Sequence, residues 1–313
     1  MRYIIENDFI KAEISDLGAT LTRFIIKKNN KDIVLGYEND DDYLKHAANF
    51  FGATVGRNAN RIGNACFILN DKKYELSKNN HMNNLHGGGI NGFSYKIWNV
   101  KEINSDKIVL HYFSKDLEEG FPGNLDIDVT YQLKDNNLIF SFVGESDQDT
   151  LFNITNHSYF NLGDVDILNH YLFVNSDKYS PTDEYDLTLD EVLDVSNSKY
   201  DFKEYRLLKD NLKKSDKGID NNYVFENLDD KLMCKLKYED IELKLYSDLP
   251  DMHIYTGDHL NNDLGKYNNI YNRFAGIALE CQYYPNGINY DNYIKPILKK
   301  NERMSHYIRY EIN

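Results

Sequence analysis

The residues Asn153-Ile154-Thr155-Asn156-His157-Ser158-Tyr159-Phe160-Asn161-Leu162 predict an extended strand near the middle of this 313-residue chain. Side chains of a strand point alternately to its two faces. Thr155, His157 and Tyr159 therefore share one face, and the residues between them share the other. The first face combines a histidine with hydrogen-bonding and aromatic side chains, which suits the binding of a ligand that carries hydroxyl groups.

His157 has two possible roles on such a strand. A histidine titrates near neutrality, so it can give or take one proton at cellular pH. A single strand histidine is, however, more often a hydrogen-bonded core residue than part of a site. The choice between these roles depends on what the rest of the chain supplies.

The composition and the periodicity of the chain favour strands over helices. The chain has 25 tyrosines and 16 phenylalanines but only 5 prolines, a composition that suits a strand-rich fold. Short runs with a period of two residues recur at the usual strand length. The expected strands include Tyr3–Ile5, Phe9–Ile14, Leu21–Ile26, Ile108–Phe113, Leu125–Leu133 and Asn137–Glu145, with a hairpin turn at Asn70–Asp71 and one short helix at Asp40–Ala48. We expect an all-β protein with few short helices. The length would allow two domains, but all-β barrels and sandwiches of this length often form one, and we expect a single domain that spans residues 1–313.

The charge balance limits the partners of the protein. Lys and Arg number 36, Asp and Glu number 50, and the formal net charge is −14. This surplus argues against binding of nucleic acid or of an anionic membrane by bulk electrostatics. The cysteines Cys66, Cys234 and Cys281 lack the short spacing of zinc or redox motifs, so we expect free thiols in a reducing compartment. The first residues carry charges throughout and no long apolar run, so we expect no signal peptide. No stretch of 18 apolar residues occurs, and we expect a cytoplasmic protein, monomeric or a small dimer.

Two glycine-containing segments could place ligand-binding groups beside the strand face. In Asn49–Gly63, the pair Asn60-Arg61 follows a glycine-framed bend, and an arginine presents a fixed, always charged fork of donors. The segment lacks the Gly-Lys-Ser/Thr of a phosphate-binding loop, and an arginine there could equally pair with a structural carboxylate. In the second segment, Asn83–Gly89, His86 precedes three glycines, which let the backbone come close to a ligand. Histidines in such loops are often functional.

Several motifs, taken together, resemble the aldose 1-epimerase family, also called galactose mutarotase. They are GATVGRNANRIG (52–63), NNLHGGGINGFSYKIW (83–98), EEGFPGNL (118–125), NITNHSYFNLG (153–163), GIDNNY (218–223), YTG (255–257) and GIALECQYYPNGIN (276–289). Their order and approximate spacing match the family, and the resemblance covers essentially the entire chain. It implies a large antiparallel β-sandwich, the galactose mutarotase-like supersandwich, and an enzyme that interconverts the α and β anomers of a free aldose.

The resemblance also implies which residues form the site. His157 matches the general acid of the family, Glu280 matches its general base, and His86 matches a second active-site histidine. The residues expected to bind the sugar are Asn60, Arg61, His86, Tyr159, Asp220 and His253. No metal and no other cofactor is implied, and the expected partner is a small-molecule sugar.

Some positions depart from the family pattern. The family commonly has a histidine after the aspartate, where this chain has Asn221, and often a glutamine at the position of His253. Its Pro-Asp-Ala becomes Pro285-Asn286-Gly287, and its Pro-Thr-Gly is replaced within Leu187–Asp190. None of these changes removes a residue assigned to proton transfer. An imidazole cannot present both a donor pair and a carbonyl as an amide does, so His253 leaves the preferred sugar open.

The chemistry implied for this site is ring opening and reclosure. O1 of the sugar must lose a proton while the ring oxygen O5 gains one, and the ring then recloses on the other face of the aldehyde. We expect Glu280 to take the O1 proton and protonated His157 to donate to O5, from opposite sides of the ring. Each group would contribute about 10²–10⁴-fold in rate. For this role the pKa of His157 should not be lowered by burial, and a nearby carboxylate would help to hold it up.

Two alternatives remain beside a mutarotase for galactose or glucose. An enzyme for another sugar or for a sugar phosphate is one, although a phosphate would call for extra basic residues. The matched segments offer only Arg57, Arg61 and Lys96. A non-catalytic sugar-binding or sensing module is the other; loss of His157 or Glu280 would have indicated it, and both are present.

Overall fold

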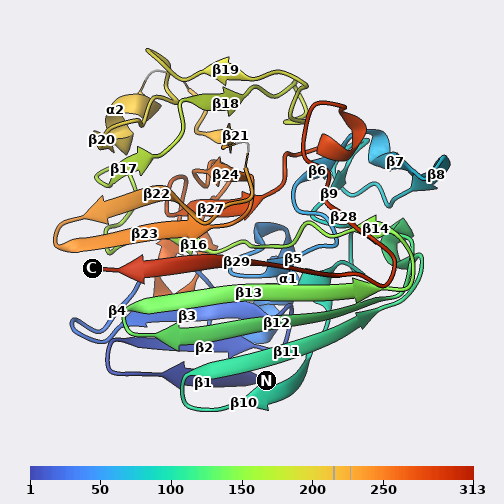
Figure 1. The fold of residues 1–313 in the computed structure, drawn as a ribbon. Coiled ribbons are helices and arrows are strands. Elements are labelled where there is room, and N and C mark those ends of the chain that lie inside the picture. The colour runs from blue at the N-terminus through green and yellow to red at the C-terminus, as the bar shows by residue number, and fades with distance from the viewer. Residues whose placement is uncertain (214–215, 226) are drawn as a thin grey trace.

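The computed structural model describes residues 1–213, 216–225 and 227–313, and antiparallel sheets dominate these residues (Figure 1). The largest sheet has nine strands, in the order β10 (Asn99–Ile103), β11 (Lys107–Ser114), β12 (Leu125–Lys134), β13 (Asn137–Ser146), β29 (Arg303–Ile312), β23 (Ile241–Ser247), β22 (Lys231–Tyr238), β17 (Tyr171–Val174) and β20 (Arg206–Leu207). The C-terminal strand β29 lies between β13 and β23, with Phe140 opposite Ile308. The last strand of the chain therefore joins two groups of strands that are far apart in sequence.

A six-stranded sheet carries most of the polar motifs. Its order is β16 (Tyr159–Phe160), β27 (Ile277–Gln282), β24 (Asp251–Tyr255), β21 (Asp220–Val224), β18 (Lys178–Ser180) and β19 (Leu193–Asp194). A four-stranded sheet follows chain order, with β1 (Arg2–Glu6), β2 (Ile10–Ser15), β3 (Thr20–Ile26) and β4 (Lys31–Asp32). Short pairs complete the set: β14 (Thr150–Leu151) with β28 (Ile297–Leu298), β15 (Thr155–Asn156) with β5 (Thr54–Val55), β6 (Arg61–Ile62) with β9 (Asn84–Leu85), β7 (Cys66–Leu69) with β8 (Lys72–Glu75), and β25 (Asp263–Leu264) with β26 (Ile270–Tyr271).

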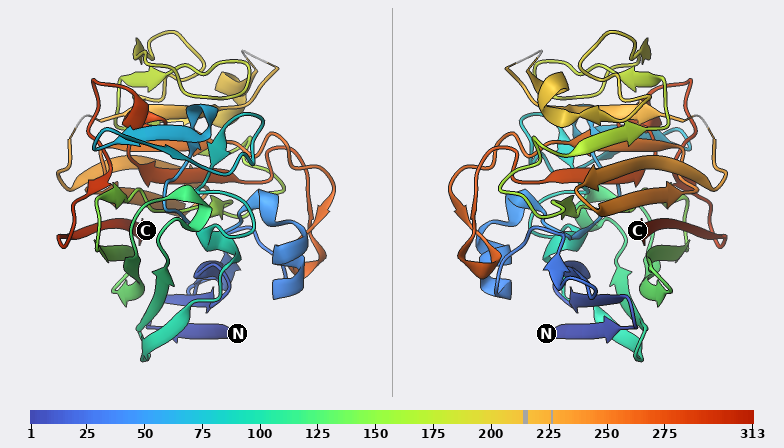
Figure 2. Two further views of the ribbon diagram at one scale, coloured as in Figure 1. Left: turned by 90° about the vertical axis from the view of Figure 1, so that its right-hand side faces the viewer. Right: turned by 90° about the vertical axis from the view of Figure 1, so that its left-hand side faces the viewer.

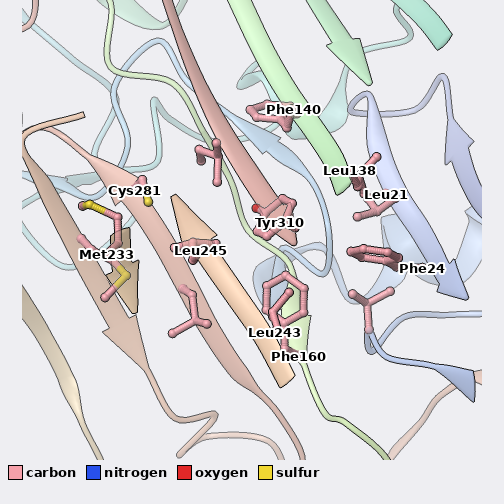
Figure 3. Close-up of a cluster of buried hydrophobic side chains, with 14 of the residues drawn as sticks. Leu21, Phe24, Leu138, Phe140, Phe160, Met233, Leu243, Leu245, Cys281 and Tyr310 are labelled. Atoms are coloured by element: carbon pink, nitrogen blue, oxygen red, sulfur yellow. The ribbon is translucent and has the colours of Figure 1, made fainter. Parts of the chain in front are cut away.

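The main core lies between these sheets (Figure 3). Leu243, Leu245 and Tyr310 of the nine-stranded sheet and Phe24 of β3 are buried there, in one cluster with Cys281 of β27. Each large apolar side chain that is fully buried contributes on the order of 1.5–3 kcal/mol. One face of β27 is thereby committed to the core, and its alternate residues are directed to the other face.

Helices are short in the described part of the chain. The α-helices are α1 (Asp40–Lys45) and α2 (Leu208–Leu212), and the 3₁₀ turns are η1 (Ala47–Asn49), η2 (Gly63–Ala65), η3 (Phe93–Tyr95), η4 (Glu118–Gly120), η5 (Lys266–Asn268) and η6 (Gly287–Asn289). The Asn39 side chain caps α1 by accepting a hydrogen bond from the backbone N–H of Asp42 at 3.0 Å. Figure 2 shows α1 beside the β25–β26 segment, where His46 Nδ1 lies 3.7 Å from Asp263 Oδ1. Among the described helices, none is long and apolar enough to cross a membrane.

The structure confirms the expected all-β class and most of the expected elements. The predicted helix at Asp40–Ala48 corresponds to α1 and the start of η1, and the hairpin turn at Asn70–Asp71 joins β7 to β8. The predicted central strand is interrupted, because β15 pairs with β5 whereas β16 pairs with β27. The three cysteines are free thiols, as expected, and Cys234 and Cys281 are buried.

Candidate active site

A cavity of about 400 Å³ borders one face of the six-stranded sheet. Its wall contains every residue that the sequence placed in the site: Asn60, Arg61, His86, His157, Tyr159, Asp220, His253 and Glu280. These residues come from segments that are far apart along the chain, and the fold brings all of them to one place.

Strand alternation explains why Glu280 and His253 line the cavity. On β27, Leu279 and Cys281 belong to the apolar core, while Glu280 between them lines the cavity. His253 of β24 lies directly opposite Glu280 in the register of the sheet. Side chains that are directly opposite on neighbouring strands share a face, so His253 also lines the cavity.

The side chain of His157, which lies between β15 and β16, contacts that of Glu280 on β27. Nε2 of His157 lies 3.4 Å from Oε1 of Glu280, and the side chains are 5% and 1% exposed. Tyr159 is opposite Ala278 on β27, which fixes the approach of this segment to the sheet. The predicted shared face is confirmed, because the rings of His157 and Tyr159 lie 5.1 Å apart at an angle of 30°.

His86 is held in one tautomer by the backbone. Its Nδ1 accepts a hydrogen bond from the backbone N–H of Asn60 at 3.1 Å, so the ring proton of the neutral imidazole is assigned to Nε2. Burial, followed by the charges of His157 and Arg61, keeps the pKa of His86 well below its usual 6.5. The loop needs glycine after His86: Gly87 has φ +80°, and a Cβ there would lie 1.9 Å from the Gly56 carbonyl oxygen.

Arg61 supplies a positive charge to the cavity wall. Its Nε donates to Oδ1 of Asn80 at 3.1 Å. Its Nη2 lies 3.8 Å from Oδ2 of Asp186 and 3.9 Å from Oδ2 of Asp220. The guanidinium is therefore already shared between two carboxylates, and its remaining donors can reach a ligand's oxygens.

Asp220 and His253 form a second close pair. Nε2 of His253 lies 2.6 Å from Oδ1 of Asp220. Burial alone raises the pKa of Asp220, but the hydrogen bond and the charge of His253, with Arg61, more than offset it, so the pKa lies below the usual 3.8. Asp220 is thus a charged acceptor for hydroxyl groups at neutral pH.

The pKa shifts of the central pair differ from the expectation. Burial lowers the pKa of His157 to about 3, although Asp220 acts in the opposite direction. Burial also raises the pKa of Glu280 well above 4.5, with the charge of Asp220 adding to this effect. The condition set for the acid role, that burial should not lower the His157 pKa, is therefore not met in the unliganded site, because desolvation outweighs the charge of Asp220. Both shifts disfavour the ion pair, with His157 protonated and Glu280 charged, relative to the neutral pair with the proton on Glu280.

The expected positions of acid and base around the ring also need correction. At 3.4 Å, His157 and Glu280 leave no space for a sugar ring between them. They are instead close enough to act on two oxygens bonded to one carbon. O1 and O5 of a pyranose are such a pair, because both are bonded to C1.

Several residues near the motifs lie outside the cavity wall. Arg57 is buried and donates to the carbonyl oxygens of Ser114, Lys115 and Pro122, so its role is structural. Lys96 lies 3.3 Å from Glu118. Asn221 points away from the cavity and donates to the Ser180 carbonyl at 3.0 Å.

Sequence reasoning missed part of the wall. Phe50, Asn80, Asp186, Tyr255 and His259 also line the cavity. The ring of Phe50 lies 4.7 Å from that of His86 and 5.7 Å from that of His157. Tyr255 could have been found, because it follows His253 by two residues on one strand and so shares its face. Nothing in the local sequence marks Phe50 or Asp186, which lie on loops.

Three residues of the wall also have a spacing that could hold a metal ion. His86, His157 and Glu280 each offer one ligand atom, and these atoms lie within 4.8 Å of one another. A second such group, His111, Asp126 and Asp128, lies on β11 and β12. Lys101 donates to Asp128 there, so a cation already occupies one of its carboxylates.

The protein is an antiparallel β-sandwich, and its cavity holds a buried carboxyl beside a histidine, an arginine and polar acceptors. Proteins of this class are suited to polyhydroxylated ligands. The chain belongs to the aldose 1-epimerase family, whose sequence profile matches residues 1–311.

Individual relatives and solved structures agree with this assignment. The chain is 33% identical over 317 residues to the galactose mutarotase of Sus scrofa, covering 97% of this chain and 92% of that protein. It is 33% identical over 294 residues to the aldose 1-epimerase of Haemophilus influenzae, covering 90% and 85%. The structure superposes on an aldose epimerase homologue from C. elegans with a TM-score of 0.94 at 28% identity, over 100% of this chain and 98% of that one. For galactose 1-epimerase from Lactobacillus acidophilus, the TM-score is 0.88 at 27% identity, over 100% and 94%. The expected galactose mutarotase-like fold is confirmed.

Proposed function

We propose that this protein is an aldose 1-epimerase that interconverts the α and β anomers of a free aldose, with galactose and glucose as the favoured substrates. The observation that carries the proposal is the contact of His157 with Glu280, 3.4 Å apart within the cavity. This pair can exchange one proton with two neighbouring oxygens of a sugar. Family membership supports the same activity.

In the proposed reaction the pair carries a single proton, which we assign to the carboxyl of Glu280 before the sugar binds. Hydroxyl groups of a bound sugar donate to the Glu280 carboxyl oxygens and favour their charged form, so the proton moves to His157. Glu280 then takes the proton of O1 as His157 donates its proton to O5, and the C1–O5 bond breaks. The C1–C2 bond of the aldehyde rotates, and the reverse transfers close the ring on the other face.

The remaining residues of the wall bind and orient the sugar. Neutral His86 donates from Nε2 and Arg61 donates from its guanidinium, and both stabilise negative charge as it develops on sugar oxygens. Asp220 accepts hydrogen bonds from sugar hydroxyls, and Asn60 contributes its side-chain amide. The ring of Tyr159 offers a flat apolar surface to the C–H groups of the sugar.

A neutral sugar suits this cavity better than a sugar phosphate. Of the three basic residues in the matched segments, Arg61 alone lines the cavity, since Arg57 is bound to backbone carbonyls and Lys96 to Glu118. Arg61 itself faces two carboxylates. Asp186 and Asp220 would repel a phosphate at the same wall.

Polarimetry of freshly dissolved α-D-galactose, and separately of α-D-glucose, tests the proposed function. We expect the wild-type protein to speed the approach to anomeric equilibrium, equally with and without EDTA, because the mechanism uses side chains alone. Binding of several aldoses without any acceleration would contradict the proposal and favour the sensing module. Activity lost with EDTA and restored by a divalent ion would contradict the metal-free mechanism.

The residue at position 253 should set sugar preference. We expect His253→Gln to change the ratio of kcat/KM for galactose and glucose by about tenfold, since a hydrogen bond to a charged group is worth about 1.5–3 kcal/mol. The substitution alters the contact with Asp220 and presents an amide to the sugar. Asn221→His is the matched control, because that residue points away from the cavity. An unchanged ratio in His253→Gln, or an equal change in the control, would rule out this role.

We further propose that residues 1–313 form one domain and act as a monomer or a small dimer. One cluster of buried apolar side chains runs from Ile5 to Ile312 and supports a single folding unit. Cooperative unfolding in a single calorimetric transition would be the expected behaviour of such a unit.

A further inference from the structure

A row of polar side chains continues from Glu280 across the six-stranded sheet. His253 is opposite Glu280, and Asn222 of β21 is opposite His253. Gln282 follows Glu280 by two residues on β27 and shares its face. Asn222 and Gln282 are both 0% exposed, and neither belongs to the cavity wall that Glu280 lines. Asn222 and Gln282 therefore share the sheet face of His253 and Glu280 but lie beyond the cavity wall, in the buried part of the protein.

Polar atoms without a hydrogen-bond partner among the described residues gather in this row. They are both side-chain atoms of Asn222, Nδ1 of His253, Oε2 of Glu280 and both side-chain atoms of Gln282. Buried polar groups are almost always hydrogen-bonded, to protein or to ordered water. A buried water typically makes about three hydrogen bonds to groups of this kind. The row has the donors and acceptors to hold such water against Oε2 of Glu280.

We propose that Gln282 and Asn222 are positioning residues for the mutarotase reaction, which hold buried water against Oε2 of Glu280 and Nδ1 of His253. This inference rests on the proposed function. Oε1 of Glu280 faces His157, whereas Oε2 has no hydrogen-bond partner among the described residues and Gln282 is two residues away on the same face of β27. Amide side chains suit this task because each can donate and accept at once.

The role follows from the proton balance of the pair. The reactive form has the proton on His157 and the charge on Glu280. Donors at Oε2 stabilise the charged carboxylate and so lower its pKa. Each unit by which the pKa of Glu280 rises makes the reactive form tenfold rarer. It also moves to higher pH the point at which the pair loses its single proton.

Other charged and titratable groups also face Glu280 and bear on its titration. On the cavity wall they are Arg61, His86, His157, Tyr159, Asp220, His253, Tyr255 and His259, and beside the amides there is the buried Asp251, which is opposite Gln282 on β24. A change at Gln282 leaves all of these in place. The effect of the row can thus be separated from the effect of the wall.

Gln282→Met tests the inference, because methionine has a similar length but lacks the amide. We expect kcat/KM near neutral pH to fall by about tenfold and the alkaline limb of its pH profile to rise by about one unit. The sugar Kd should stay within about threefold, as the residue lies outside the cavity. Asn222→Leu should act in the same direction and gives a second variant if the first does not fold. Gln282→Glu, which keeps the oxygen acceptors but lacks the amide donors, should lower kcat/KM at least as much as Gln282→Met.

Leu279→Met is the matched control, since it makes a volume-conserving change on the core face of the same strand. It should leave the pH profile in place. Difference infrared titration of the Glu280 carboxyl, assigned by its loss in Glu280→Gln, gives a readout that needs no activity. A higher carboxyl pKa in Gln282→Met supports the inference even if the wild type proves inactive on every sugar, an outcome that would remove the proposed function alone. An unchanged carboxyl pKa in Gln282→Met and in Asn222→Leu would overturn the inference, as would an equal shift in Leu279→Met.

Discussion

Replacing Glu280 with glutamine is expected to lower kcat for mutarotation by about 10²–10⁴-fold. The amide has nearly the same shape but can neither take the O1 proton nor hold the proton of the pair. Because Glu280 is 1% exposed and burial raises its pKa, which favours the uncharged carboxyl, the neutral amide should fit without unfolding the sheet. Polarimetry at saturating galactose measures the loss, and calorimetric titration with galactose shows whether the sugar still binds.

The exposed residue Glu145 on β13 provides a matched control for this substitution. Glu145→Gln makes the same chemical change far from the cavity wall and should leave kcat unaltered. Retention of most of the wild-type rate by a folded Glu280→Gln protein would exclude Glu280 as the base. If Glu280→Gln does not fold, kcat is measured instead for Glu280→Asp, which keeps the carboxyl but moves it away from His157.

His157→Asn is expected to lower kcat by a similar factor of about 10²–10⁴. Asparagine can hydrogen-bond the sugar but cannot carry a proton to O5. The double variant with Glu280→Gln should be little worse than either single variant, since the two groups act on one proton and such effects are not additive. His81→Asn is the control, because His81 is exposed and outside the cavity wall. Additive losses in the double variant would show that the two residues act in separate steps.

The pH profile of the wild type tests the same pair without a substitution. An ordinary histidine would give a break in kcat/KM near pH 6.5. Burial lowers the pKa of His157 to about 3, so the pair does not take up a second proton as the pH falls through 6.5. Activity should therefore persist below pH 6.5 and fall on the alkaline side, where Glu280 loses the single proton. A break at 6.5 that is lost in His157→Asn would contradict this order of protonation.

The alternation along the central strand illustrates what could be predicted from sequence. Alternation is a property of neighbouring residues, so the shared face of His157 and Tyr159 follows from the backbone of any strand. The motif resemblance, not alternation, placed eight residues in one site, and all eight line the cavity. The interruption between β15 and β16 was not predicted, because it depends on β5 and β27, which compete for this segment from distant parts of the chain.

Local patterning of this chain was enough to predict strands, an all-β fold and the residue types of a sugar site. The 3.4 Å contact of His157 with Glu280 arises only in the folded protein, from the pairing of segments that are distant in sequence. The protonation state of that pair likewise depends on the folded protein, since desolvation depends on everything packed around a group. The arrangement of Asn222 and Gln282 beside Glu280 and His253 is likewise decided only by the tertiary structure. Sequence spacing does not show which buried amides share a row, because strand register is set by pairing across the whole sheet.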